Sequence, residues 1–342
     1  MGRKRFYEND MFESLLDIID KITANIPDDH KYHYFWCPKK KDSACLNGFR
    51  LYVHGGYALS LYVDDKNNKV RCTNNIFKYK EYFEDKTFLK NLEKKTGVDR
   101  YVTINDVKDW FSSNDWDVIF TAYKKRGFVE RGKETFIAKM SEDYVEGQML
   151  IIDMESSVRN CVSIRKNPKP DLVGIRKVEN KWILSFIEYK CTESGTKGVT
   201  LKTHYNDMRD YYNDCSIEGN SYYNSLFEQY IDAAISKLKQ IEKRNCQKRQ
   251  KIEISDIVKG EIVFLFSNIG QNGFTSQLIC NEVNYLDNKC IIDNSVKFCL
   301  LGDVTDNVVQ FIEPLNLKEF LKAPVFAKCD KDQWKRKKPD VQ

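Results

Sequence analysis

The stretch Lys169–Lys190, KPDLVGIRKVENKWILSFIEYK, most constrains what this chain can fold into. Two apolar runs, Leu172–Ile175 and Trp182–Ile187, are separated by the polar segment Arg176–Lys181. Short apolar runs bounded by polar residues are typical of strands that are buried in a sheet. The pattern therefore predicts a buried two-stranded unit with a turn at Arg176–Lys181.

Three charged residues stand at the ends of these runs: Asp171 before the first, and Glu188 and Lys190 at the end of the second. Residues two apart on a strand point to the same face of a sheet. If the strands pair as a hairpin, two carboxylates and an ammonium group converge at one edge. Such a group can hold a hard divalent cation and orient a water molecule. The alternative is a surface hairpin with an ordinary, weak salt bridge.

Pro170-Asp171, followed by sixteen residues and Glu188-Tyr189-Lys190, resembles the signature of the PD-(D/E)xK nuclease superfamily. The resemblance covers about residues 128–267. It implies an α/β fold with a restriction-endonuclease-like αβββαβ core, in which helices flank a mixed central sheet, beside a separate N-terminal α+β domain. It also implies a nuclease that hydrolyses phosphodiester bonds in nucleic acid, in the first place DNA. A role in defence or restriction is a further expectation from the family.

The elements of this core can be assigned along the sequence. A leading helix is expected at Gly132–Glu146 and a first strand at Gln148–Glu155. The two strands of the hairpin follow, and then come a helix at Leu201–Tyr212 and a strand at Glu261–Ser267.

The resemblance also implies roles for the charged residues. Asp171 and Glu188 would bind Mg²⁺ or Mn²⁺, and the backbone carbonyl of Tyr189 would complete the metal shell. Lys190 would orient the attacking water or stabilise the charge that develops on the phosphate. Glu134, early in the leading helix, is expected to add a carboxylate to the site.

Basic residues after the hairpin are candidates for nucleic-acid binding. Lys202 and His204 lie near the start of the helix expected from Leu201. A second basic cluster is expected at the end of a long helix: Lys243, Arg244, Lys248 and Arg249. For the first group the alternative is an imidazole that caps the helix or packs against it, and for the second group it is a solvated helix end.

A different site is suggested by two segments of the N-terminal part. Phe49–Val63 reads as a strand, a Gly-Gly turn and a helix, and Asn114–Phe120 reads as a strand with two alternating aspartates. Together they resemble the opening motifs of polymerase-β-like nucleotidyltransferases, in which glycines approach a triphosphate and aspartates hold Mg²⁺. The residues of this alternative nucleotide site are Gly55, Gly56, Asp115 and Asp117. The structural alternatives are a tight turn for the two glycines, and a helix cap and an edge strand for the two aspartates.

The two interpretations compete for one strand. A nucleotidyltransferase needs a third carboxylate on a later strand, and Asp153 is the candidate. Its strand is also the first core strand of the nuclease interpretation, so it does not serve both folds. A third interpretation is a non-catalytic nucleic-acid-binding protein that keeps the fold and the basic helix.

Length and composition set the remaining expectations. With 342 residues the chain exceeds one usual core. We therefore predict an N-terminal domain at 1–127, a nuclease-like domain at 128–315 and a basic tail at 316–342. A net charge of +5 is too small to indicate a partner by itself. Eleven scattered cysteines are expected to be free thiols of a cytoplasmic protein. A homodimer stays open.

Two further expectations concern membranes and zinc. The sequence holds no run of eighteen apolar residues, so no membrane-spanning helix and no membrane partner are expected. His30, His33, Cys37 and Cys45 have residue types that bind zinc, but an aromatic loop with incidental Cys and His residues is the preferred interpretation.

Overall fold

The structure of the chain is a computed structural model. The described residues are 10–27, 33–36, 47–64, 69–107, 110–125, 129–141, 149–154, 170–179, 181–192, 199–214, 234, 257–270, 274–290, 292–301 and 314–336. Contacts divide the chain into two compact units. The first comprises Met1–Glu142 with Phe227–Ile254, and the second comprises Asp143–Leu226 with Ser255–Gln342.

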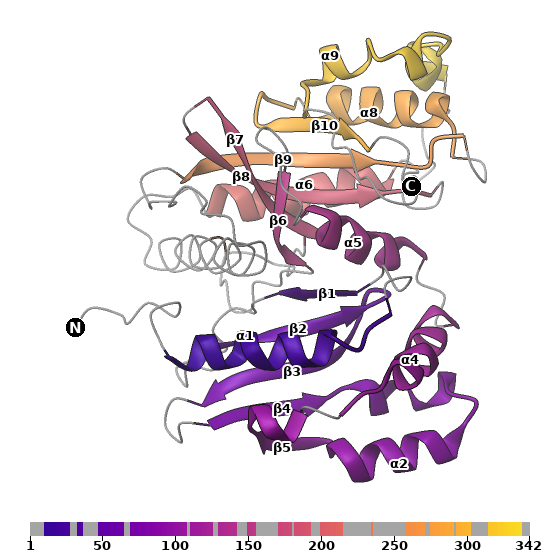
Figure 1. Ribbon diagram of the computed structural model, residues 1–342. Helices are drawn as coiled ribbons and strands as arrows, with labels where there is room; N and C mark the ends of the chain where they lie inside the picture. Colours follow the sequence, from indigo (N-terminus) through magenta and orange to yellow (C-terminus); the bar gives the residue numbers. More distant parts are fainter. Residues whose placement is uncertain are drawn as a thin grey trace. The chain divides into compact units, whose positions relative to one another are not determined.

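The first unit is built on an antiparallel meander of five strands, in which each strand pairs with the next along the chain. The strands are β1 (His33–Trp36), β2 (Asn47–Val53), β3 (Gly56–Asp64), β4 (Lys69–Asn74) and β5 (Asp99–Val102). Its helices are α1 (Asp10–Thr23), the 3-10 helix η2 (Ile76–Tyr82), α2 (Lys86–Thr96), α3 (Ile104–Val107), α4 (Ser113–Lys125) and α5 (Val129–Met140). The unit is therefore mixed α/β, with the helices packed around one sheet (Figure 1).

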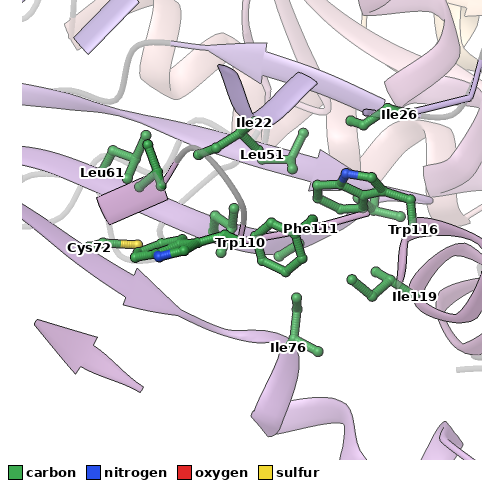
Figure 2. Close-up of a cluster of buried hydrophobic side chains, with 14 of the residues drawn as sticks. Ile22, Ile26, Leu51, Leu61, Cys72, Ile76, Trp110, Phe111, Trp116 and Ile119 are labelled. Atoms are coloured by element: carbon green, nitrogen blue, oxygen red, sulfur yellow. The ribbon is translucent and has the colours of Figure 1, made fainter. Parts of the chain in front are cut away.

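One face of this sheet carries the hydrophobic core of the first unit. Alternate residues of the strands, such as Leu51, Leu61 and Cys72, are buried there because side chains of a strand alternate between faces. Trp116 and Phe111 lie against each other in the same cluster, with ring centroids 4.7 Å apart. Figure 2 shows these rings beside Ile119 and Ile26 within the cluster.

The Gly-Gly segment forms a hairpin turn, so the predicted strand–turn–helix at Phe49–Val63 is wrong. His54 and Gly55 both have positive φ, 45° and 76°, which is the geometry of a two-residue turn between right-twisted strands. Gly56 then begins β3, which pairs with β2 as far as Asn47 opposite Val63. Alternating apolar residues and β-branched or aromatic neighbours favour a second strand here over a helix.

The segment around Asp115 is helical, so the predicted strand at Asn114–Phe120 is also wrong. It lies within α4, where Trp116, Ile119 and Phe120 are buried at helical spacing. The helix begins with a reciprocal cap. The N–H of Ser112 donates to Oδ2 of Asp115 at 2.8 Å, and the N–H of Asp115 donates to Oγ of Ser112 at 3.2 Å.

The second unit is a five-stranded mixed sheet with the order β10-β9-β8-β7-β6. Its strands are β6 (Met149–Met154), β7 (Leu172–Val178), β8 (Lys181–Lys190), β9 (Ile257–Phe266) and β10 (Val296–Leu300). Strands β6, β7 and β8 pair antiparallel, whereas β8, β9 and β10 pair parallel. The helices are α6 (Val199–Asp214), α8 (Ser276–Cys290) and α9 (Leu317–Phe320), with the 3-10 helices η5 (Pro324–Phe326) and η6 (Gln333–Arg336).

Several predicted elements of this unit are confirmed. Each of their observed ends lies within four residues of the predicted end. The strands expected at Gln148–Glu155 and Glu261–Ser267 correspond to β6 and to the end of β9, and the helix expected from Leu201 is α6. Of the residues predicted as a basic tail, 316–336 are described. Phe320 and Phe326 are buried there, and Gln277 of α8 is hydrogen-bonded to the backbone of Asp330 in both directions.

The hairpin of β7 and β8 has the predicted pairing but a shorter turn. Leu172 lies opposite Ile187 and Val178 opposite Lys181, so the strands extend through most of the polar segment that was predicted as a turn. Glu179, with φ 54°, follows β7 directly. Arg176 lies inside the sheet because its guanidinium group has a buried acidic partner, described below.

No helix in the described part of the chain is long and apolar enough to cross a membrane.

Candidate active site at the end of the β7–β8 hairpin

Asp171 lies beside the end of β8, as the sequence predicts. Since Leu172 pairs with Ile187, Asp171 falls next to Glu188 across the hairpin. The carboxylate oxygen Oδ2 of Asp171 accepts a hydrogen bond from the backbone N–H of Tyr189 at 2.9 Å. This bond fixes the carboxylate at the open end of the two strands.

Glu188 is the centre of the site. Its Oε1 atom accepts from Nζ of Lys190 at 2.7 Å and lies 2.8 Å from Nδ1 of His204. Lys190 comes from the same strand two residues later, and His204 comes from α6. Two side chains from two elements, Lys190 of β8 and His204 of α6, therefore meet at one oxygen of the Glu188 carboxylate.

The electrostatics of Glu188 follow from these contacts. Burial alone would raise the pKa of its carboxyl group, because the charged form loses its water. The hydrogen bond from His204 and the positive charge of Lys190 outweigh that effect, so the pKa of Glu188 lies below its ordinary value. The side chain is therefore a buried carboxylate anion at neutral pH, which is the form that binds cations.

The ion pair is not the surface salt bridge that was the alternative interpretation. Glu188 is 1% exposed and Lys190 is 5% exposed. A buried pair of charges is costly to form, and removing one partner leaves the other without compensation. The burial of this pair distinguishes the end of the hairpin from a solvated strand end.

The opposite face of the same strands carries a second polar group. Arg176 of β7 donates twice to Glu261 of β9, at 2.7 and 2.8 Å, and Oγ of Ser185 donates to the same carboxylate at 2.9 Å. Further along β8, the hydroxyl groups of Tyr189 and Ser267 are hydrogen-bonded at 2.5 Å. Residues 185 and 189 alternate with 186, 188 and 190, so this group is separate from the candidate site.

The other predicted site residues lie on further elements or outside the described residues. Glu134 is buried on α5, a helix of the first unit. Lys202 is on α6 and half-buried, two residues before His204. The remaining predicted nucleic-acid contacts, Lys243, Arg244, Lys248 and Arg249, lie outside the described residues, as do the side chains of the zinc candidates His30, His33, Cys37 and Cys45.

The residues of the alternative nucleotide site have structural roles. The N–H of Gly55 donates to Oγ1 of Thr135 at 2.9 Å, inside the first unit. Asp115 caps α4, and Asp117 lies one half-turn further along the same helix on its exposed side. Two of the structural alternatives, the tight turn and the helix cap, describe Gly55 and Asp115, whereas the edge strand was wrong because both aspartates lie on α4.

Asp153 was assigned only to the transferase interpretation, but the sheet register places it on the same face as Glu188. Asp153 pairs with Val173, and Val173 pairs with Phe186, which precedes Glu188 by two residues. Asp153 is completely buried. The signal in the sequence was an aspartate at the end of the apolar run Leu150–Ile152, a position where a strand normally continues with apolar residues.

The donor set at the hairpin fits Mg²⁺ or Mn²⁺ in type. Asp171 and Glu188 offer carboxylate oxygens, which are the ligands that hard cations prefer, and Mg²⁺ is commonly held by one or two carboxylates plus water and substrate phosphates. Within the described residues, no group of three or more His, Cys, Asp or Glu side chains is arranged to hold a metal ion. A metal here would therefore depend on water and substrate for much of its shell.

No protein-family model, no curated protein and no solved structure matches this chain.

Proposed function

We propose that the second unit is a metal-dependent nuclease that hydrolyses phosphodiester bonds in nucleic acid, in the first place DNA. The observation that carries the proposal is the convergence of Asp171, Glu188 and Lys190 at the end of one hairpin, with Glu188 and Lys190 buried. A buried carboxylate and ammonium pair beside a second carboxylate is expensive to maintain for structure alone. It is well suited to chemistry on a phosphate group.

The arrangement of elements supports the same proposal. Within the second unit, β6, β7, β8, α6 and β9 follow one another in the order βββαβ, which is the order that the sequence resemblance implies after the leading helix of its core. The sheet is mixed, with β7 antiparallel to both of its neighbours. We therefore propose a restriction-endonuclease-like core in which β7 and β8 carry the site.

Each side chain has a defined role in this proposal. Asp171 and Glu188 would hold Mg²⁺ or Mn²⁺, with the carbonyl of Tyr189 as a further ligand. When bound, the metal would neutralise the scissile phosphate and lower the pKa of a bound water. Lys190 would donate a hydrogen bond to the attacking water or to a phosphate oxygen. His204 holds the Glu188 carboxylate from the side of α6.

The nucleotidyltransferase alternative is not proposed. It required a helix after Gly56 and a strand that carries Asp115 and Asp117. The first segment is a strand and the second is a helix, so the geometry on which that interpretation rested is not formed.

The test is cleavage of plasmid DNA, single-stranded DNA and RNA by the full chain with Mg²⁺ or Mn²⁺. Asp171→Asn removes the charge but keeps an oxygen for the N–H of Tyr189, and Lys190→Ala removes the ammonium group. Each is expected to lower the cleavage rate by about 10²-fold or more. Matched controls are Glu179→Gln and Lys181→Ala at the other end of the hairpin, where both side chains are exposed.

The controls are expected to cleave like the wild type, and thermal unfolding would show that all variants are folded. Cleavage that survives both Asp171→Asn and Lys190→Ala would overturn the proposal. A chain that binds nucleic acid but cleaves none of the three substrates would favour the non-catalytic binding protein instead.

A further inference from the structure

The two faces of the sheet in the first unit differ in character. One face is the hydrophobic core described above. On the other face, Tyr62 of β3 lies opposite Arg71 of β4, and Arg71 lies opposite Tyr101 of β5. Residues paired across strands lie side by side on one face. The three residues therefore form a row of ring, guanidinium and ring across three neighbouring strands.

This row is accessible to solvent at its β4–β5 end. Tyr101 is 46% exposed, and the side chain of Arg71 is 45% exposed. Of the large apolar side chains that are exposed in the described parts of the chain, Tyr101 is the only aromatic one. A sheet usually places its aromatic rings against a core, because burial of a ring is strongly favourable. An exposed ring beside cations has the two groups that stack on a base and contact a phosphate.

The positive charges around Tyr101 are held in place. Arg71 donates from Nε to Oδ1 of Asp99 at 2.8 Å and makes a second bond from Nη2 to Oδ2 of the same carboxylate. This two-bond contact fixes the plane of the guanidinium group. Lys69 is exposed, and its Nζ lies 5.7 Å from the centroid of the Tyr101 ring. At the other end of the row, Nε of Arg50 lies 3.4 Å from the hydroxyl of Tyr62.

We propose that Tyr62, Lys69, Arg71 and Tyr101, here called the open face, bind single-stranded nucleic acid. Unpaired bases stack on exposed aromatic rings, and Lys and Arg beside the rings contact the phosphates. A duplex offers no unpaired base to such a ring. The binding itself does not require cleavage. Its consequence for substrate choice, a preference of the nuclease for single strands, rests on the proposed function of the second unit.

The experiment measures binding of a fluorescein-labelled oligothymidylate to the full chain by fluorescence anisotropy, with EDTA present to prevent cleavage. Tyr101→Ala is expected to weaken binding by about 5-fold or more, since stacking of one base contributes about 1 kcal/mol or more. Tyr101→Phe keeps the ring and should bind like the wild type. Lys69→Ala should reduce the slope of log affinity against log salt by up to about 1.

The matched control is Val118→Ala, because Val118 is an exposed apolar residue of the same unit, on α4. It should leave the affinity unchanged. The proposal is overturned if Tyr101→Ala binds oligothymidylate like the wild type, or if the wild type binds no oligonucleotide. It is also overturned if Tyr101→Ala lowers the affinity for a DNA duplex as much as the affinity for oligothymidylate. Tyr101→Phe keeps the aromatic ring and serves as the folding reference. If Tyr101→Ala binds weakly because it is misfolded, its thermal unfolding temperature will be lower than that of Tyr101→Phe.

The two proposals fail separately. If Asp171→Asn abolishes cleavage but Tyr101→Ala leaves binding intact, the nuclease stands and the open face does not. If Tyr101→Ala weakens binding while Asp171→Asn cleaves like the wild type, the open face stands and the nuclease proposal does not.

Discussion

Glu188 and Lys190 are two residues apart on β8, and Nζ of Lys190 lies 2.7 Å from Oε1 of Glu188 with both side chains almost fully buried. Lys190→Met should therefore lower the free energy of unfolding by about 3 kcal/mol, because it leaves a buried carboxylate without one of its partners. The loss is at the low end for buried pairs, since His204 still contacts Glu188. Urea unfolding in EDTA measures it.

The surface pair Lys322–Glu319 provides the control for this measurement. Its side chains are 61% and 45% exposed, and Lys322→Met should cost less than about 1 kcal/mol. The double variant Glu188→Gln/Lys190→Met should recover part of the lost stability, because both buried charges are then removed. Equal losses for Lys190→Met and Lys322→Met would contradict the burial argument.

Gly260 of β9 is predicted to tolerate no side chain. A Cβ atom at this position would lie 1.4 Å from the carbonyl oxygen of Leu184, next to the irregular register of β8 and β9. Gly260→Ala must separate the two strands and should cost well over about 3 kcal/mol. At Gly174, the nearest atoms are Cγ and Sδ of the Met149 side chain, at 2.8 and 2.9 Å, and this side chain can shift more easily than a backbone carbonyl. Gly174→Ala should cost clearly less in the same denaturation assay.

The reciprocal cap of α4 gives a prediction that distinguishes a capping role of Asp115 from a role in nucleotide transfer. Asp115→Ala removes the acceptor for the N–H of Ser112 and should lower stability by about 1 kcal/mol. Asp117→Ala, on the exposed side of the same helix, should change it by less than about 0.5 kcal/mol. Neither variant should alter cleavage. Loss of a nucleotide-transfer activity in both variants would restore the alternative that we do not propose.

Cys72 predicts a loss of stability in alkaline solution. Burial raises the pKa of its thiol well above the ordinary value, so the folded chain keeps a proton that the unfolded chain releases above pH about 8.5. The unfolded state binds fewer protons there, and stability falls as pH rises. Between pH 7.5 and 9.5, the wild type should lose about 1 kcal/mol more than Cys72→Ala. Denaturation at several pH values measures the difference, and parallel curves would contradict the prediction.

The second unit could be predicted closely because its signals are local. Long apolar runs gave β6, β7, β8 and β9, and the polar residues at their ends gave Asp171, Glu188 and Lys190. The pairing of Leu172 with Ile187 follows from a short turn between two strands of similar length. The turn was predicted too long because Arg176 is charged. Its burial depends on Glu261, which lies 85 residues further along the chain and is not visible in a local pattern.

The first unit shows where local patterns mislead. The segment around Asp115 contains a run of aspartates and apolar residues that fits period 2 as well as period 3.6, and only burial of Trp116 and Phe120 selects the helix. The second half of Phe49–Val63 contains Ala58, Leu59 and Leu61, whose residue types favour helices, and was predicted as a helix. Its pairing with both β2 and β4 outweighs that propensity.

The two polar groups on β8 have a consequence for how this strand can vary. Glu188 and Lys190 occupy one face, whereas Ser185 and Tyr189 bond partners on the other. Insertion or deletion of one residue between Ser185 and Glu188 would exchange the faces. A deletion would bring Tyr189 to the place beside Asp171, whereas an insertion would bring the residue before Glu188 there. In both cases the carboxylate of Glu188 and the hydroxyl group of Tyr189 would leave their present faces together. The polar contacts on both faces therefore select against insertions and deletions in β8. A single substitution, in contrast, changes the contacts of one face and leaves those of the other face in place.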